Sequence, residues 1–342
     1  MRIGIPREVK DGEQRVALSP AAVQSLKNVV VEPGAGRGVG FSDDDYRKAG
    51  ATLGDPWECD LVVKVKELQE SEYARPRRGQ TVFGFQHFGP DRALLDAALA
   101  SGATFIAFET VGQASGLPIL SPMSAIAGRL AVQAGAWCLQ KQNGGSGVLL
   151  PGVEGIAPGK VVIAGAGNVG ANALHVACGF GADVTVFSRS EKPRLKATYP
   201  RAVFRTDRIS IEAADLVIAG VLTPGQMSPK LITRAMLRAM RPGSVFVDVG
   251  IDQGGIAETS RPTSHSQPTF VEEGVVHYCV PNMPAAAART ASLALERAVL
   301  PFVKKILQGD FSGELATGIQ VKGGKVTHEH LARDTGRAYS RL

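Results

Sequence analysis

The chain has 342 residues, of which 44% are hydrophobic and 20% charged, and it carries a net charge of +6. This composition suits two globular domains with sizeable cores and excludes a disordered chain. The basic residues are spread along the sequence, so the charge does not indicate a nucleic-acid-binding protein. No apolar run approaches the roughly 20 residues that span a bilayer, and no signal peptide is evident, so we expect a cytoplasmic protein.

Cysteine and histidine patterns give no sign of a metal. The four cysteines stand far apart without a Cys-x-x-Cys pair, which favours neither a disulfide framework nor a zinc site. His328 and His330 are too few to propose a metal site, and we expect them at the surface.

The first half of the chain alternates short apolar strands with helical patterns, which predicts a mostly parallel sheet with helices on its faces. Ser19 as N-cap and Pro20 at the first helical position predict a helix over 20–27. A second helix is expected over 91–101, and a long helix over 125–142 carries the chain out of this domain. The predicted strands are 2–6, 29–32, 61–66, 81–85 and 104–109.

The most informative segment is 160–172, where an apolar strand enters a Gly-x-Gly-x-x-Gly turn that opens into helical sequence. Gly165 permits the tight turn, Gly167 lets backbone N–H groups approach a phosphate, and Gly170 lets the helix pack close to the sheet. A second strand at 183–187 completes a βαβ spacing. We therefore predict a dinucleotide site with the pyrophosphate at the helix N-terminus. Its residues are Gly165, Gly167, Asn168, Val169 and Gly170.

The residues after the second strand bear on cofactor choice. An acidic residue there usually binds the adenosine ribose and repels a 2′-phosphate. This chain has Ser188, Arg189 and Ser190 instead, with no carboxylate until Glu191. A guanidinium and two hydroxyls suit a phosphate, so the sequence favours NADP(H). The alternative is NAD(H), with Arg189 solvated and Glu191 or a backbone group holding the ribose.

Further strands at 215–219, 244–249 and 275–279 continue the second sheet, and a long helix over about 285–307 returns the chain to the first domain. We predict an α/β fold of two Rossmann-like doubly wound domains joined by long helices, with a cleft between them. Residues 1–124 plus 305–342 form the expected substrate domain, and residues 125–304 the dinucleotide-binding domain.

Cationic residues near strand ends indicate an anion or carbonyl site. Arg15 ends a polar turn, where it is well placed to point into the cleft. Lys64 and Lys66 alternate with valines, which predicts that both project from one face of their strand. The alternative is that these lysines are ordinary solvated residues.

Two residues that exchange protons also follow predicted strands. His87 stands at the tip of an apolar strand, and a histidine can give and take a proton near neutral pH. The alternative is a hydrogen-bonded histidine that closes the strand. Asp252 follows another strand beside two glycines that let the backbone pass close to a ligand. Its alternative is an aspartate in an Asx-turn.

These positions stand in motifs that resemble the alanine dehydrogenase family, which shares its fold with the nucleotide-binding part of proton-translocating nicotinamide nucleotide transhydrogenase. The resemblance runs nearly end to end, and the last two motifs look like alanine dehydrogenase rather than transhydrogenase. The matching segments are 5–8, 15–20, 64–67, 122–124, 127–129, 251–255 and 278–284.

The resemblance implies the reversible oxidative deamination of a small L-2-amino acid, L-alanine to pyruvate and ammonia, with hydride transfer to NAD(P). It implies that Arg15 and Lys66 hold the substrate carboxylate and oxo group, and that His87 and Asp252 are catalytic. It also implies pocket and nicotinamide contacts from Met123, Ser124, Asn282 and Met283. The family generally assembles as hexamers, so a homo-oligomer is expected, with a dimer as the alternative.

Departures from the family pattern leave alternatives open. The usual carboxylate is absent at Ser188, and the segment 283–290 is rich in alanine where the chain should flank the substrate. A larger 2-oxo acid or a secondary amine is therefore an alternative substrate. Two rival functions are a transhydrogenase-like nucleotide-binding module without a small substrate and a catalytically idle binder. The joint presence of Arg15, Lys66, His87 and Asp252 argues against the binding module, because a hydride handover surface needs no carboxylate clamp.

Overall fold

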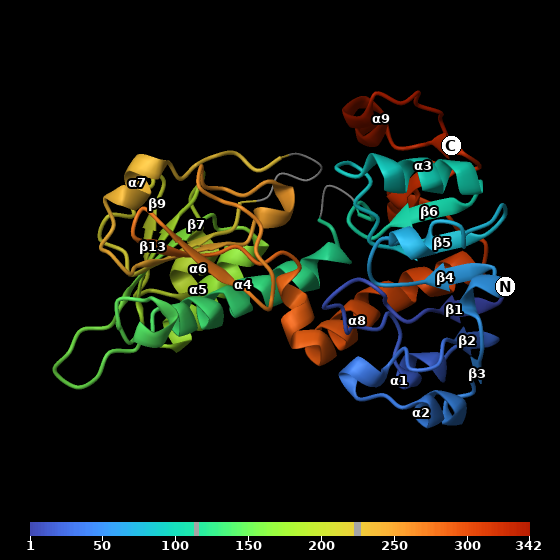
Figure 1. Cartoon of the computed structure of the whole chain (residues 1–342), viewed down its shortest axis with the longest axis horizontal. Coiled ribbons are helices and arrows are strands. Elements are labelled where there is room, and N and C mark those ends of the chain that lie inside the picture. The colour runs from blue at the N-terminus through green and yellow to red at the C-terminus, as the bar shows by residue number, and fades with distance from the viewer. Residues whose placement is uncertain (113–115, 222–226) are drawn as a thin grey trace. The chain divides into compact units, whose positions relative to one another are not determined.

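The computed structural model describes residues 1–112, 116–221 and 227–342, and it divides into two compact units (Figure 1). Unit 1 comprises Met1–Met123 and Ala287–Leu342, and unit 2 comprises Ser124–Ala286. The sequence analysis put the second division after residue 304, whereas here it precedes helix α8 (Ala288–Leu307). The helix belongs with unit 1 because it contacts that unit: Ser292 Oγ accepts the backbone N–H of Val16 at 3.0 Å.

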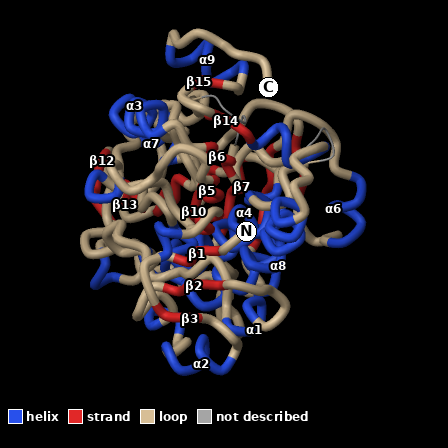
Figure 2. The backbone as a smooth tube through the Cα atoms, turned by 90° about the vertical axis from the view of Figure 1, so that its right-hand side faces the viewer, coloured by secondary structure: helices blue, strands red, loops and turns tan. Residues whose placement is uncertain are grey.

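The described part of unit 1 forms an eight-stranded sheet in the order β15-β14-β6-β5-β4-β1-β2-β3. Strands β1 to β6 pair in parallel with their neighbours, and β14 is antiparallel to both β6 and β15. Figure 2 shows β1, β2 and β3 succeeding one another at this end of the sheet. The strands are β1 (Ile3–Ile5), β2 (Val29–Val31), β3 (Thr52–Leu53), β4 (Leu61–Val63), β5 (Thr81–Gly84), β6 (Thr104–Ala107), β14 (Ile319–Lys322) and β15 (Lys325–Val326). The helices of unit 1 besides α8 are α1 (Pro20–Val23), α2 (Asp43–Lys48), α3 (Arg92–Ser101) and α9 (Glu329–Thr335).

The described part of unit 2 forms a seven-stranded sheet in the order β12-β13-β11-β10-β7-β8-β9. All neighbours pair in parallel except β12, which is antiparallel to β13. The strands are β7 (Lys160–Ala164), β8 (Asp183–Phe187), β9 (Val203–Arg205), β10 (Leu216–Ala219), β11 (Val245–Asp248), β12 (Thr269–Glu272) and β13 (Val275–Tyr278). The helices are α5 (Asn168–Gly179), α6 (Pro193–Thr198) and α7 (Arg234–Arg238), with α4 (Leu120–Cys138) beginning in unit 1 and continuing here.

The central strands of the unit 2 sheet are buried on both faces. In β10, Leu216 and Ile218 pack into one apolar cluster, and Val217 and Ala219 pack into another. Successive side chains of a strand point to opposite faces, so a strand covered on both faces reads as a continuous apolar run. This pattern explains why the central strands were predictable from sequence.

Both sheets share one topology, which confirms the predicted doubly wound fold. The order β3-β2-β1-β4-β5-β6 in unit 1 matches β9-β8-β7-β10-β11-β13 in unit 2. The order reverses between β1 and β4 and again between β7 and β10. Ligands of such sheets bind outside the carboxyl ends of the strands at this switch point. The segments that follow β1, β4 and β7 are therefore where each unit's site is sought.

Element ends differ from the prediction in places. Helix α5 begins at Asn168, directly after the glycine turn, and α4 spans Leu120–Cys138 rather than the predicted 125–142. Pro122 did not delay α4, because proline is tolerated in the first turn of a helix. The strands missed from sequence are short and lie near the sheet edges, as in β9, where no residue is buried. Among the described residues, no helix is long and apolar enough to cross a membrane.

Candidate active site

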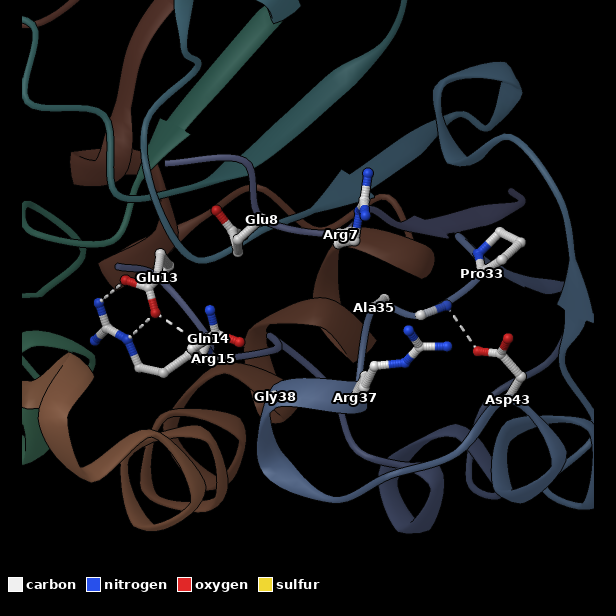
Figure 3. Close-up of a pocket in the computed structure, with 11 residues that line it drawn as sticks. Arg7, Glu8, Glu13, Gln14, Arg15, Pro33, Ala35, Arg37, Gly38 and Asp43 are labelled. Carbon is white, nitrogen blue, oxygen red and sulfur yellow. Dashed lines mark hydrogen bonds and ion pairs between the residues drawn. The ribbon is translucent and has the colours of Figure 1, made fainter. Parts of the chain in front are cut away.

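Arg15 follows β1 and is almost wholly buried. Its Nε lies 2.7 Å from Glu13 Oε1, and its NH2 nitrogen lies 2.5 Å from Glu13 Oε2, so the two side chains form a bidentate pair (Figure 3). The side chains of Arg15 and Glu13 are 1% and 0% exposed. The NH1 nitrogen lies 3.2 Å from Met123 Sδ at the start of α4. The structure thus brings Arg15 and Met123 together, and it adds a carboxylate that the sequence analysis did not name.

A cavity of about 360 Å³ opens beside this pair. Its lining includes Glu8, Gln14 and two further arginines, Arg7 and Arg37. Figure 3 shows the guanidinium of Arg15 turned to Glu13 rather than toward Arg7 and Arg37. The buried pair therefore forms one wall of an open, charged pocket at the carboxyl ends of β1 and β2.

The two lysines after β4 have different surroundings. The prediction that both lie on one strand is wrong, because β4 ends at Val63. Lys64 Nζ lies 2.8 Å from Glu72 Oε2 and 3.7 Å from Glu8 Oε2, and its side chain is 1% exposed. Lys66 Nζ instead lies 3.7 Å from Glu67 Oε2 and 5.8 Å from the centre of the Phe85 ring. Neither lysine is a solvated surface residue.

Burial sets the electrostatics around Lys64. Burial raises the pKa of Glu8 to about 7, although the charge of Lys64 opposes the shift. The Glu8 carboxylate also accepts the backbone N–H of Val65 at 2.6 Å, which ties the segment after β1 to the segment after β4. Burial alone would lower the pKa of Lys64, but the charges of Glu8 and Glu72 outweigh it and raise that pKa. The cluster therefore keeps Lys64 charged and braces the turn that carries Lys66.

His87 follows β5 with a left-handed backbone, at φ 47°. Its N–H donates to Glu109 Oε1 at 2.8 Å, and its ring Nδ1 lies 2.8 Å from Glu67 Oε2. The ring stacks on Phe85 at 5.7 Å between centroids, and the side chain is 40% exposed. His87 and Lys66 thus share two neighbours, Glu67 and Phe85.

The unit 2 residues of the predicted site gather near one turn. Asp252 is exposed in the 3₁₀ turn η5 (Ile251–Gln253). Its Oδ2 lies 3.4 Å from the backbone nitrogen of Asn282, a residue held at φ 55°. Met283 comes next and is buried at the start of η6 (Met283–Ala287). Ser124 lies in the first half of α4.

The glycine turn between β7 and α5 fits a dinucleotide. Gly165 has φ 106°, and a Cβ there would lie 2.9 Å from the carbonyl oxygen of Gly220. A Cβ on Gly170 would lie 1.8 Å from the carbonyl oxygen of Gly165, so the helix passes close to the turn. A Cβ on Gly167 would meet no atom within 4 Å, and among the described residues no side-chain hydrogen bond caps this end of α5. The helix N-terminus, at Asn168 and Val169, therefore presents the positive end of the helix dipole beside an uncrowded turn, which suits an anion.

The loop after β8 contains the three residues that were predicted to favour NADP(H). Ser188 donates its N–H to the Arg205 carbonyl at 3.0 Å and its hydroxyl to the Ser190 carbonyl at 2.8 Å. Arg189 and Ser190 are exposed. Within the part of the chain that the structure describes, none of the three residues is hydrogen-bonded or ion-paired to a carboxylate.

The residues that sequence reasoning missed are carboxylates. Glu13 binds Arg15, Glu67 contacts Lys66 and His87, and Glu109 holds the backbone of His87. Two of them lie within two residues of a predicted cation, as in Lys66-Glu67 and Glu13-Gln14-Arg15. That proximity in sequence was the available signal. The position of Glu109 at the end of β6, beside β5, became evident only from the fold.

Comparisons with known proteins cover the whole chain. Two family models match, described as "Alanine dehydrogenase/PNT, N-terminal domain" over residues 4–127 and "Alanine dehydrogenase/PNT, C-terminal domain" over residues 131–329. An alanine dehydrogenase of Halomonas elongata is 47% identical over 99% of this chain and 98% of its own length. One of Bacillus subtilis is 43% identical over 99% and 96%.

Solved structures agree with these relatives. An L-alanine dehydrogenase structure is 42% identical with a TM-score of 0.90, covering 98% of this chain and 99% of its own. A transhydrogenase structure from Sinorhizobium meliloti is 27% identical with a TM-score of 0.82, covering 96% and 99%. The chain therefore belongs to the alanine dehydrogenase/PNT family.

Proposed function

We propose that this protein catalyses the reversible oxidative deamination of L-alanine to pyruvate and ammonia with a nicotinamide nucleotide. The observation that carries the proposal is the full-length identity of 43–47% to alanine dehydrogenases, combined with the cationic and proton-exchanging residues after β1, β4 and β5 of unit 1. The transhydrogenase-like alternative is not favoured, because the curated relatives matched at this identity are alanine dehydrogenases.

The reaction needs a cation for the substrate carboxylate. Arg15 supplies it, and Glu13 fixes the plane of the guanidinium and directs the NH1 nitrogen toward Met123. Charge-assisted contacts to a guanidinium are directional, so a fixed plane gives the substrate a fixed orientation. We propose that the carboxylate binds at this edge, with Met123 as a pocket wall.

The reaction also needs a group that polarises the developing C=N or C=O bond and a group that takes the ammonium proton. Lys66 is suited to the first role, since its ammonium lies 3.7 Å from the Glu67 carboxylate oxygen that also contacts His87. His87 and Asp252 are suited to move protons as imine and carbinolamine form in turn.

The nucleotide would bind at the turn between β7 and α5, where Gly167 leaves room for a pyrophosphate, while Gly165 and Gly170 permit the tight turn and the close approach of α5. When bound, it supplies the acceptor for the Cα hydride. We propose that Asn168 and Val169 contact the phosphates through their backbone at the start of α5. Ser124, Asp252, Asn282 and Met283 are the proposed contacts of the nicotinamide end.

We further propose a preference for NADP(H) over NAD(H). The supporting observations are the exposed Arg189 between two serines and the lack of a carboxylate partner there in the described residues. Arg189→Ala should lower kcat/KM for NADPH about tenfold, or about 1.4 kcal/mol, and leave NADH use nearly unchanged. Arg201→Ala, a second exposed arginine of unit 2, is the matched control. Wild-type preference for NADH would contradict this part of the proposal.

The test of the main function is the absorbance change at 340 nm with NADPH or NADH, ammonia and a panel of 2-oxo acids that includes pyruvate. Oxidation of the reduced nucleotide with pyruvate and ammonia together is the expected result. His87→Ala should lower turnover by about 10²-fold to 10⁴-fold and leave nucleotide binding nearly intact. Silence with every acid, in a protein that binds nucleotide, would overturn the proposed function.

We also propose that the protein is a homo-oligomer. Leu149, Val153 and Ile156 of unit 2 are 59%, 60% and 67% exposed. Val153 and Ile156 pair their backbones in a small antiparallel bridge, which presents the apolar side chains on a compact loop. Exposed apolar patches of this kind are typical of association surfaces. Light scattering after size exclusion should give a mass that is a multiple of 35.9 kDa, and Ile156→Lys should reduce it.

A further inference from the structure

One carboxylate joins the two residues proposed to act on the substrate in unit 1. Glu67 Oε2 lies 2.8 Å from His87 Nδ1 and 3.7 Å from Lys66 Nζ. Its other oxygen, Oε1, accepts from Lys10 Nζ. The Glu67 side chain is only 10% exposed. Glu67 is therefore the shared partner of three groups that carry or accept positive charge.

These contacts keep Glu67 ionised. Burial by itself would raise the pKa of Glu67, but the hydrogen bond from His87 and the charges of Lys66, His87 and Lys10 outweigh burial and hold the pKa below its usual range. An ionised carboxylate only accepts hydrogen bonds, so the Nδ1 nitrogen of His87 must carry the hydrogen. In the neutral imidazole the lone pair is then on Nε2, the nitrogen that does not face Glu67.

The backbone and the neighbouring ring hold the imidazole in this contact. Glu109 accepts the backbone N–H groups of Gln86 and His87, at 3.1 and 2.8 Å from Oε1. That clamp supports the left-handed φ of His87, which L-residues rarely adopt. The imidazole also stacks on Phe85, whose ring faces the Lys66 ammonium as well.

Charged groups face His87 from each neighbouring segment. Glu67 and Lys66 face it from the segment after β4, and Glu109 from the end of β6. Lys10, from the segment after β1, lies behind Glu67. Of these groups, Glu67 is the one whose side chain contacts a ring nitrogen in the structure.

We propose that Glu67 is a positioning residue for the reaction, which holds His87 in the tautomer with a basic Nε2, stabilises its protonated form, and keeps Lys66 beside it. The inference rests on the proposed function, because it assigns Glu67 a role in proton transfer from the substrate. Glu67 itself takes no proton and touches no substrate atom in this scheme.

The first test is Glu67→Gln in the intact enzyme. The amide cannot stabilise an imidazolium, and its NH₂ group can select the other tautomer, so kcat for alanine oxidation should fall about 10²-fold. The loss should appear in kcat more than in KM for alanine, because Arg15 is untouched. Since a base must be unprotonated to act, the acid limb of the kcat/KM profile should move to lower pH. Glu67→Asp should recover part of the activity.

Two further variants separate positioning from general damage. Glu72→Gln is the matched control, a buried carboxylate five residues away that binds Lys64 and makes no described contact with Lys66 or His87. It should leave the acid limb in place. Lys10→Met removes a cation behind Glu67, so the carboxylate should stabilise the imidazolium more strongly and the acid limb should move to higher pH. Opposite shifts from Glu67→Gln and Lys10→Met are hard to produce by unfolding.

A readout independent of turnover completes the design. Diethylpyrocarbonate modifies the neutral imidazole, and peptide mass spectrometry can follow His87 alone as a function of pH. The midpoint of its modification should move to lower pH in Glu67→Gln, with NADPH binding and thermal unfolding retained. An unchanged midpoint, or an unchanged acid limb in a folded variant, would overturn the role of Glu67. Absence of amino-acid turnover in the wild type would instead overturn the proposed function, which keeps the two failures apart.

Discussion

The two units build their proposed sites from different materials. In unit 2 the turn between β7 and α5 consists of backbone, closely packed at Gly165 and Gly170 and uncrowded at Gly167. In unit 1 the corresponding region after β1, β4 and β5 consists of buried charged side chains, among them the pair of Arg15 and Glu13. The same strand order therefore carries two opposite kinds of proposed anion site.

The difference implies opposite weaknesses. A binding site made of backbone is disrupted when one atom is added, because the added atom occupies the space for the ligand or clashes with the backbone of the turn. A surface made of charges is lost when one partner is removed, because the remaining ion is left buried without compensation. Adding a methyl group in unit 2 and removing one charge in unit 1 are the two tests of this comparison.

The largest effect is expected when the pair of Glu13 and Arg15 is broken. Glu13→Gln leaves a buried guanidinium without its carboxylate, so unit 1 should lose about 3–5 kcal/mol of unfolding free energy. The chain has two tryptophans, Trp57 in unit 1 and Trp137 in unit 2. Urea unfolding in a Trp137→Phe background therefore follows unit 1 through Trp57 alone.

The double variant Glu13→Gln with Arg15→Met is the control for this pair. It removes both charges, so it should be less destabilised than the sum of the two single variants by 2 kcal/mol or more, of the size expected for coupled partners. Additive losses would show that Glu13 and Arg15 are not energetically coupled. They would contradict the description of the unit 1 site as one that depends on paired buried charges.

A smaller effect is expected from one methyl group in unit 2. A Cβ at Gly170 would lie 1.8 Å from the Gly165 carbonyl, and backbone cannot move aside as a side chain can. Gly170→Ala should therefore cost about 2–3 kcal/mol, the upper part of the range for overpacking, and weaken NADPH binding at least tenfold. Unfolding is followed through Trp137 in a Trp57→Phe background.

Gly179→Ala at the far end of α5 is the control. Its added Cβ would meet no atom within 4 Å, so this variant should be neutral or slightly stabilising. Equal behaviour of the two variants would refute the close approach at Gly170.

The same difference decides what the sequence could predict. The glycine turn was located to the residue, because glycine at fixed spacing after an apolar strand reports a local backbone requirement. The central strands were predicted because both of their faces are buried, whereas the short strands at or next to the sheet edges, β3, β9, β12, β14 and β15, lacked such a signal.

The charged residues of the unit 1 site were predicted only in part. Arg15, Lys66 and His87 were named as candidates because each follows a strand, yet their partners Glu13, Glu67 and Glu109 were not. A carboxylate near a cation in sequence is usually a solvated pair, and only the fold shows which of these pairs are buried. The prediction that Lys64 and Lys66 lie on one strand was wrong because β4 ends at Val63, three residues before the predicted end.

The smallest effect concerns the pH dependence of unit 1. The pKa of Glu8 rises to about 7 in the folded chain because of burial, while an unfolded glutamate titrates near 4.5. The folded state therefore binds the proton more tightly. The resulting stability is fully present below about pH 4.5 and is lost as the pH rises through about 7. At 1.36 kcal/mol per pKa unit, the loss of stability is at most about 3 kcal/mol, and we expect about 1–2 kcal/mol because the structure relaxes around the ionised group.

Glu8→Gln cannot titrate, so it should gain stability relative to the wild type between pH 5 and 8. Glu32→Gln, a half-buried carboxylate after β2, should leave the wild-type slope intact. A wild-type slope that persists in Glu8→Gln would assign the pH dependence to another group. A slope lost only in Glu8→Gln would show that the buried charges around Lys64 make unit 1, unlike the glycine turn of unit 2, sensitive to pH.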